Sequence, residues 1–226
     1  MQSAPFHNGY GLMTVHGVRK PSWHAFKLLH GAGNSRLPVS GFVSPADPTS
    51  TVSVLATSGG PSVQDGVGTQ IFVANYHRLS SVSRFSCDKT KKQCSPSANG
   101  PYTDSSLCNA ECSTADYASG ISLPRPRADD PDCPAQNVTL TLLHPSTTAL
   151  PSSLSTVYRI DDANSNPKAM WESLGSPVYP NASVIAALHA ASSLKLATPI
   201  LVTKINTTAS SISFHMPSYS VLYISF

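Results

Sequence analysis

After Pro38, the apolar residues of the chain recur at every second position, and clusters of Gly, Pro, Asn and Ser interrupt them. Seven runs show this pattern: TSTVSVLAT, TQIFVANYH, NVTLTLLH, STVYRID, PILVTKI, SSISFHM and YSVLYISF. A period of two between turn residues is typical of antiparallel strands. In NVTLTLLH apolar residues alternate with Thr, whereas YSVLYISF is apolar on both faces. We therefore expect a mainly β fold, an antiparallel β-sandwich in which the last strand is covered on both sides.

A few short helices accompany these strands. The stretch NSNPKAMWESLG predicts a helix that Asn166 caps, Pro167 begins and Gly175 ends. The stretch that follows predicts a second helix with its buried side at Ile185, Leu188 and Leu194. Both lie between the fourth and fifth predicted strands.

The first 35 residues have a different pattern. GYGLMTV is a β-prone run, and KPSWHAFKLLHG predicts a helix with Pro21 at its start. Trp23, Phe26 and Leu29 recur at helical spacing, so we expect them to form the apolar face, with other apolar residues beside it. A strand followed by an amphipathic helix is the closing unit of an α/β barrel. We expect residues 1–35 to be the last strand–helix unit of a (β/α)8 barrel, followed by a β-sandwich domain over 36–226.

Composition excludes several classes of partner. Charged residues make up 12% of the chain, and the net charge of +3 is not gathered in any basic run, which disfavours nucleic acid. No apolar run approaches the 18 residues of a membrane span, so we expect no membrane association.

The cysteines gather in one polar segment. Cys87, Cys94, Cys108 and Cys112 lie close together, and Cys133 follows. Zinc is the alternative, but no Cys-x-x-Cys pair occurs and no His lies at ligand spacing, so we expect disulfides and no metal. The sequence does not define which cysteines pair with one another, or whether Cys133 takes part in a disulfide. Because five is an odd number, one thiol is free or has its partner outside the chain.

Three sequons for N-linked glycosylation occur, at Asn137, Asn181 and Asn206. Together with oxidised cysteines, they favour the secretory pathway and an extracellular, lysosomal or vacuolar location. The opening MQSAPFHNGYG has neither the apolar core nor the cleavage site of a signal peptide. We therefore expect that the true N-terminus precedes this sequence.

One motif resembles a known family. Residues 160–180, IDDANSNPKAMWESLGSPVYP, are similar to a motif of glycoside hydrolase family 39, which comprises β-xylosidases and α-L-iduronidases. FVANYH resembles a sandwich strand of that family, and the opening stretch resembles the end of its barrel. The residues that match in the opening stretch are Gly9, Tyr10, Gly11, Leu12, Lys20, Pro21, Ala25, Phe26, Leu28 and Leu29. Two features depart from the pattern: Leu174 replaces a Met, and the cysteine segment 85–134 has the character of an insertion.

The resemblance implies the C-terminal part of a retaining O-glycosyl hydrolase, which acts without a cofactor on a carbohydrate substrate. Such enzymes use two carboxyl groups, and in this family both are Glu. The chain has two Glu, and neither Glu111 nor Glu172 lies in a catalytic motif. Asp161 matches a family position that we interpret as structural. We therefore expect a chain that lacks its N-terminal barrel and is inactive alone, and we leave open whether it is itself an enzyme.

The candidate binding residues lie near the end of the predicted barrel strand. Phe6, His7 and Asn8 are expected to line a sugar pocket, with a packed loop as the alternative. For His16, His24 and His30 we expect surface or capping roles. Two other functions remain open: a non-catalytic glycan-binding β-sandwich, and a secreted interaction protein whose cysteine segment is the functional part.

Overall fold

The computed structural model describes residues 5–6, 11–40, 51–59, 68–76, 85–88, 93–96, 133–147, 150–154 and 156–226. The chain divides into two compact units, one formed by Met1–His77 with Arg125–Phe226 and the other by Arg78–Pro124. In the second unit, the described residues form a hairpin of β4 (Phe85–Asp88) and β5 (Gln93–Pro96). This hairpin was not among the predicted strands, and the predicted insertion 85–134 stays a prediction.

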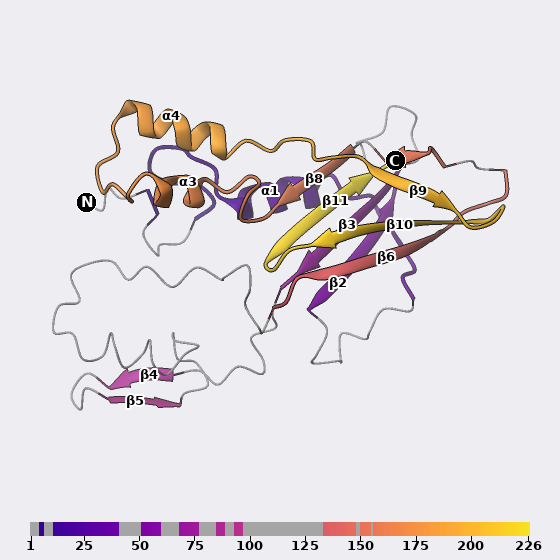
Figure 1. The fold of residues 1–226 in the computed structure, drawn as a ribbon, viewed down its shortest axis with the longest axis horizontal. Coiled ribbons are helices and arrows are strands. Elements are labelled where there is room, and N and C mark those ends of the chain that lie inside the picture. The colour runs from indigo at the N-terminus through magenta and orange to yellow at the C-terminus, as the bar shows by residue number, and fades with distance from the viewer. Residues whose placement is uncertain are drawn as a thin grey trace. The chain divides into compact units, whose positions relative to one another are not determined.

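The first unit contains two antiparallel sheets (Figure 1). The five-stranded sheet has the order β1 (Ser35–Leu37), β2 (Val52–Ser58), β3 (Thr69–Asn75), β11 (Ser220–Ser225) and β8 (Thr156–Ile160). The four-stranded sheet has the order β6 (Gln136–Leu143), β10 (Ala209–Met216), β9 (Ile200–Lys204) and β7 (Ser153–Leu154). All seven predicted strands are confirmed.

The main hydrophobic core joins residues of the two sheets. From the five-stranded sheet it takes Ile71, Val73, Val157, Leu222 and Ile224, and from the other sheet Val138, Leu154, Ile200, Ile212, Phe214 and Met216. Each such side chain contributes about 1.5–3 kcal/mol when it is withdrawn from water. The predicted β-sandwich is therefore confirmed.

Three helices lie in the described residues: α1 (Pro21–His30), α3 (Pro167–Ser173) and α4 (Ala182–Ala191). The Asn166 side chain accepts a hydrogen bond from the Lys168 amide and so caps α3 as predicted. Gly175, with a φ of +82°, follows the end of α3 in the left-handed conformation that glycine adopts most readily. No helix in these ranges is long and apolar enough to cross a membrane.

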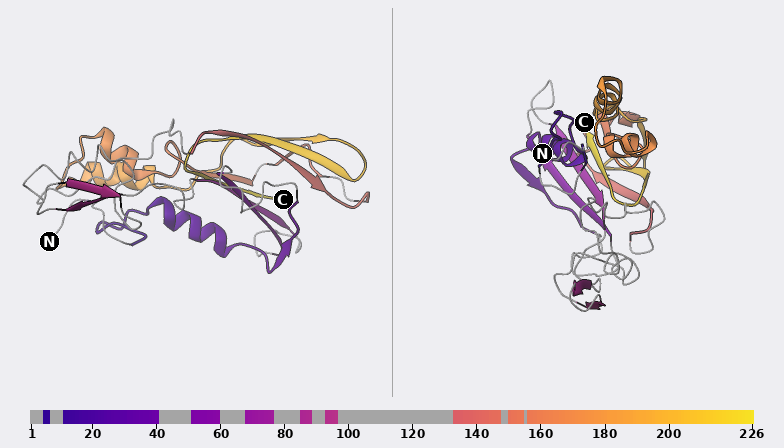
Figure 2. Two further views of the ribbon diagram at one scale, coloured as in Figure 1. Left: turned by 90° about the horizontal axis from the view of Figure 1, so that it is seen from below. Right: turned by 90° about the vertical axis from the view of Figure 1, so that its left-hand side faces the viewer.

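Helix α1 covers the outer face of the five-stranded sheet (Figure 2). Leu28 packs there with Phe72, Ile160 and Tyr223, and the rings of Phe72 and Tyr223 lie 4.9 Å apart. Since Leu222 on the same strand faces the sandwich core, β11 is covered on both sides, as predicted.

The predicted apolar face of α1, which would need a barrel sheet as its partner, is not the side of the helix that packs on the sandwich. Leu28 and His24 are buried, whereas Phe26 is 61% exposed and Leu29 is 43% exposed. The helix is apolar around much of its circumference, so periodicity alone does not define which side meets a sheet. The face that contains Phe26 and Leu29 is left open to solvent.

The predicted strand GYGLMTV is not a strand in its described part. Residues 11–15 contribute only an isolated bridge between Met13 and Arg19. A barrel strand needs a neighbouring strand on each side, and the described ranges supply none to this segment. The assignment of residues 1–35 to a barrel therefore stays a prediction.

Candidate functional site

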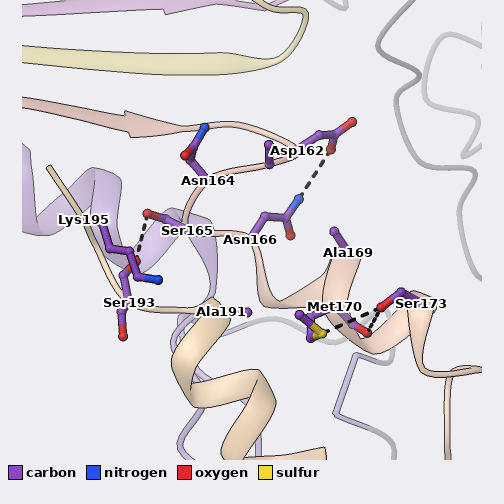
Figure 3. Close-up of a pocket in the computed structure, with 11 residues that line it drawn as sticks. Asp162, Asn164, Ser165, Asn166, Ala169, Met170, Ser173, Ala191, Ser193 and Lys195 are labelled. Carbon is purple, nitrogen blue, oxygen red and sulfur yellow. Dashed lines mark hydrogen bonds between the residues drawn. The ribbon is translucent and has the colours of Figure 1, made fainter. Parts of the chain in front are cut away.

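A cavity of about 450 Å³ lies between the loop that follows β8, helix α3 and the end of α4 (Figure 3). Its lining is mostly polar and small. The residues are Asp162, Ala163, Asn164, Ser165, Asn166, Ala169, Met170, Ser173, Ala191, Ser193 and Lys195.

A buried carboxylate shapes the loop that forms one wall of this cavity. Asp161 Oδ1 accepts hydrogen bonds from the backbone N–H of Ala163 at 2.9 Å and of Asn164 at 2.8 Å. It also accepts one from Asn164 Nδ2 at 2.8 Å. A carboxylate that closes its own loop in this way holds the backbone in one conformation. Asp161 thus has the structural role that we predicted.

Ser165 fastens the same loop to the end of α4. Its φ of +56° is uncommon for a residue with a side chain, and the residue is buried. The hydroxyl lies 3.3 Å from the Arg159 carbonyl and 3.3 Å from the Ser193 carbonyl, and donates towards both. These contacts hold together two cavity walls that are far apart in the sequence.

Several polar groups around the cavity already have partners within the chain. Asn166 Nδ2 donates to Asp162 Oδ1 at 3.4 Å, while its Oδ1 accepts from the Lys168 amide. Lys168 Nζ lies 3.7 Å from Glu172 Oε1 across one turn of α3. Asn164 Nδ2 donates to Asp161 Oδ1 and Ser193 Oγ donates to the His189 carbonyl, while Lys195 also lines the cavity (Figure 3).

The lining does not contain the pair of acids that a glycosidase needs. A retaining glycosidase needs two carboxyl groups about 5–5.5 Å apart, and an inverting one needs two further apart. Asp162 is the single carboxylate among the lining residues. Glu172 is engaged with Lys168, and Glu111 lies outside the described residues. The cavity can therefore bind a polar group, but its lining lacks the pair that glycoside hydrolysis requires.

Of the predicted sugar-pocket residues, only Phe6 is described. Its ring lies 5.6 Å from that of Trp171, in a cluster with Val18 and Leu188. Trp171 is buried and donates its Nε1–H to the Pro177 carbonyl at 3.0 Å. Phe6 thus packs against a hydrophobic cluster, which fits the alternative of a packed loop. His7 and Asn8 lie outside the described residues, and their role in binding stays a prediction.

His24 is not at the surface, but it has the capping role that was the predicted alternative, because it is hydrogen-bonded to the residue that ends α4. It is 1% exposed, and Nε2 is hydrogen-bonded to the Ser192 carbonyl at the end of α4. Burial lowers the pKa of His24, and although the Ser192 carbonyl raises it in part, the positive charges of Arg19 and Lys27 lower it further. His30 is exposed in the last turn of α1, as expected.

The cysteine and metal predictions are tested only in part. Cys87 and Cys94 face one another in the register of β4 and β5. Cys133 is fully buried, and its thiol lies 3.7 Å from Asn75 Oδ1. Cys108 and Cys112 lie outside the described residues, so the disulfide framework stays a prediction. Within the described ranges, no group of three or more His, Cys, Asp or Glu is placed to hold a metal ion.

The three sequon asparagines are all exposed. In each, Oδ1 accepts a local hydrogen bond: from His215 Nδ1 to Asn137, from the Val184 amide to Asn181, and from the Thr208 amide to Asn206. The sugar would be attached to the side-chain nitrogen, and in all three asparagines the residue is open to solvent. Glycosylation itself stays a prediction.

Comparison with solved structures identifies the fold as that of a β-sandwich found in glycosidases. The chain resembles the glycoside hydrolase family 39 enzyme of Xanthomonas axonopodis pv. citri with a TM-score of 0.58 and 17% identity, over 99% of this chain and 33% of that one. It resembles a monomeric β-xylosidase of Caulobacter crescentus CB15 with a TM-score of 0.50 and 19% identity, over 99% of this chain and 34% of that one.

A sequence comparison adds a local match. Over 37 residues the chain is 43% identical to a β-xylosidase of Caldicellulosiruptor saccharolyticus, a match that covers 16% of this chain and 8% of that enzyme. No protein-family model matches the chain. The predicted resemblance to the C-terminal portion of glycoside hydrolase family 39 is confirmed, and the chain spans about a third of the length of the solved enzymes.

Proposed function

We propose that the chain is the C-terminal part of a retaining O-glycosyl hydrolase, that it supports a catalytic barrel, and that it does not hydrolyse glycosides alone. The fold likeness carries this proposal, since it extends over 99% of the chain and only a third of the enzyme. The cavity, with its single carboxylate, agrees with a supporting role.

The surface of α1 suggests where the barrel would sit. Phe26 and Leu29 are exposed beside Trp23, and the Arg19 guanidinium lies 4.4 Å from the centre of the Trp23 ring. Lys27 Nζ approaches the same ring at 5.6 Å. An apolar patch rimmed by charged groups is typical of a surface that another protein covers. We therefore expect the barrel to pack on this face of α1.

Sequencing of the complete transcript would give the amino-acid sequence of the barrel, which a direct test requires. We expect in-frame codons for strand–helix units that contain an Asn-Glu pair and a second Glu. The barrel, expressed as a separate polypeptide, should then be captured by this chain and regain glycosidase activity. A transcript without such codons would contradict the proposal.

A substitution on α1 tests whether the barrel packs on the face that contains Phe26 and Leu29. Phe26→Asp should abolish both capture and activity, because it places a charge in an apolar contact. Leu143→Asp is the matched control, since Leu143 is exposed on the other sheet and the substitution should leave capture unchanged. Equal losses in the two variants would count against α1 as the docking face.

The cavity favours one second function, the binding of a glycan without catalysis. Lys195 lines the cavity with an ammonium group, and Asn164 Oδ1 and Ser193 Oγ can still accept hydrogen bonds from a ligand rich in hydroxyls. On a glycan array the purified chain should then bind at least one oligosaccharide, and Lys195→Ala should weaken that binding several-fold, whereas Lys204→Ala should not. Absence of binding to every glycan would remove this function.

We further propose that the protein enters the secretory pathway, carries N-linked glycans and has disulfides in its cysteine segment. The solvent exposure of Asn137, Asn181 and Asn206 supports the glycans, and the Cys87–Cys94 register supports a compact cysteine segment. Expression behind a signal peptide in eukaryotic cells should give a product whose mass falls on treatment with an N-glycosidase. Reduction should change its mobility in a non-reducing gel. An unchanged mass would exclude the glycans, and an unchanged mobility would exclude the disulfides.

A further inference from the structure

His24 is a buried, titratable side chain at the junction of two helices. It lies in the first half of α1, and its partner Ser192 is the residue that ends α4. Both residues are buried, with His24 only 1% exposed. The bond from His24 Nε2 to the Ser192 carbonyl therefore joins segments that are 168 positions apart in the sequence.

The two ring nitrogens of His24 have different surroundings. Nε2 faces a carbonyl, which accepts hydrogen bonds only, so Nε2 carries the proton and donates it. Nδ1 is buried and has no hydrogen-bond partner. The neutral imidazole fits this site, since its unprotonated nitrogen needs no acceptor. A second proton on Nδ1 would be a buried donor without a partner.

The charges around the ring also disfavour protonation. Arg19, before the helix, and Lys27, on the helix, both act on His24 as positive charges. The His24 and Trp23 rings are nearly perpendicular, with 5.1 Å between their centroids. From α4 the facing group is the Ser192 carbonyl, and the titratable residue of its last turn is the exposed His189. On β8, which contacts α1, the cation Arg159 donates to the His215 carbonyl. An imidazolium ion at position 24 would thus be desolvated and repelled by the two cations Arg19 and Lys27.

We propose that His24 is an acid-sensitive latch that holds α1 against the end of α4. With a neutral ring the latch is closed by the Nε2–H bond to Ser192. When the ring takes up a second proton, the closed arrangement leaves a buried charge without an acceptor, and α1 separates from α4. This inference concerns the attachment of α1 and does not depend on the proposed function.

The direction of the pH effect follows from the pKa of His24, which burial lowers below the ordinary value of 6.5. A lowered pKa means that the closed latch binds fewer protons than the open one. The stabilisation is therefore fully present above about pH 6.5 and is lost as the pH falls from there to the lowered pKa. Because the open ring titrates near 6.5, the open fraction grows by about tenfold for each further pH unit until the closed form also protonates.

Amide-exchange protection factors of α1, corrected for the intrinsic pH dependence of exchange, test the latch. In the wild-type chain, protection over residues 22–30 should fall between pH 7 and pH 5.5, by at most about tenfold. His24→Gln retains an N–H donor and cannot titrate, so its protection should be unchanged over this range. His30→Gln, on the exposed side of the same helix, should behave like the wild type. An equal fall in His24→Gln would overturn the proposal.

The wild-type chain provides a second measurement if His24→Gln does not fold. The ring proton resonances of His24 should titrate below pH 6.5, and the amide resonances of α1 should change over the same pH range. A midpoint at or above 6.5, or an α1 that remains unchanged while the ring takes up its proton, would overturn the latch.

Discussion

Leu28 and Leu29 are adjacent on α1, yet Leu28 is 8% exposed against the five-stranded sheet, while Leu29, about 100° further around the helix, is 43% exposed. This difference fixes the orientation of the helix. One side of α1 completes the outer core of the sandwich, and the other is free to contact a second surface.

Alanine substitutions at the two leucines should have very different effects. Leu28→Ala leaves a cavity beside Phe72 and Tyr223, and we expect the free energy of unfolding to fall by about 2–4 kcal/mol. Leu29→Ala removes a side chain that is half open to water and should cost less than about 0.5 kcal/mol. Urea denaturation followed by circular dichroism measures both. Equal losses would contradict the orientation of α1.

Polar substitution of the open face should improve the behaviour of the chain in solution. Phe26→Ser with Leu29→Ser removes exposed apolar area without touching the face of α1 that meets the sheet, so we expect less aggregation at the same concentration. Light scattering of the purified variant against the wild type gives the result. Deletion of α1 is the contrasting variant, because it uncovers Phe72 and Tyr223 and should increase aggregation.

Asn75 lies at the end of β3 and connects this strand to two other segments of the chain. Its Nδ2 lies 3.0 Å from the Pro134 carbonyl, 3.4 Å from the Met216 carbonyl and 2.9 Å from the Pro217 carbonyl. Asn75→Ala leaves these acceptors with fewer partners inside the protein, and we expect a loss of about 2–4 kcal/mol in the free energy of unfolding. Asn137→Ala, at an exposed position, is the control and should cost less than about 1 kcal/mol. Similar losses in the two variants would show that Asn75 does not hold these segments together.

Asp161 should control the cavity through the loop that it closes. Asp161→Ala removes the acceptor of the Ala163 and Asn164 amides, so the loop loses its fixed conformation. We expect faster amide exchange at both residues and a loss of about 2–3 kcal/mol of stability. Asp162→Ala, one position along, leaves those hydrogen bonds in place. If the neighbouring substitution had the same effect on the loop, this role of Asp161 would be excluded.

The strands could be predicted because each buries alternate residues, which leaves a period of two in the sequence. Leu222 and Tyr223, for example, face opposite sides of β11, and both sides are covered. The short β1 and β7 were missed, since three and two residues are too few to show a period. The packing of α1 on the sandwich through Leu28 could not be predicted, because it depends on the shape of the sheet surface rather than on the helix alone.

The cavity was only partly visible in the sequence. The motif that begins at Ile160 was recognised and its Asp161 was interpreted correctly, but Ser193 and Lys195 come from a segment about thirty positions later. No pattern joins the two segments, since their contact runs through the Ser165 hydroxyl and a backbone carbonyl. The burial of His24 was missed for a similar reason, because its partner is also a backbone carbonyl, which leaves no mark in a sequence.

The rate at which the purified chain releases nitrophenol from nitrophenyl glycosides, the β-xyloside and the α-L-iduronide among them, tests the central claim most directly. We predict no rate above that of buffer, because the cavity offers Asp162 without a second carboxylate. Sustained turnover that is lost in Asp162→Asn, and retained in the exposed control Lys204→Ala, would show that the chain has a catalytic site of its own and would contradict the account.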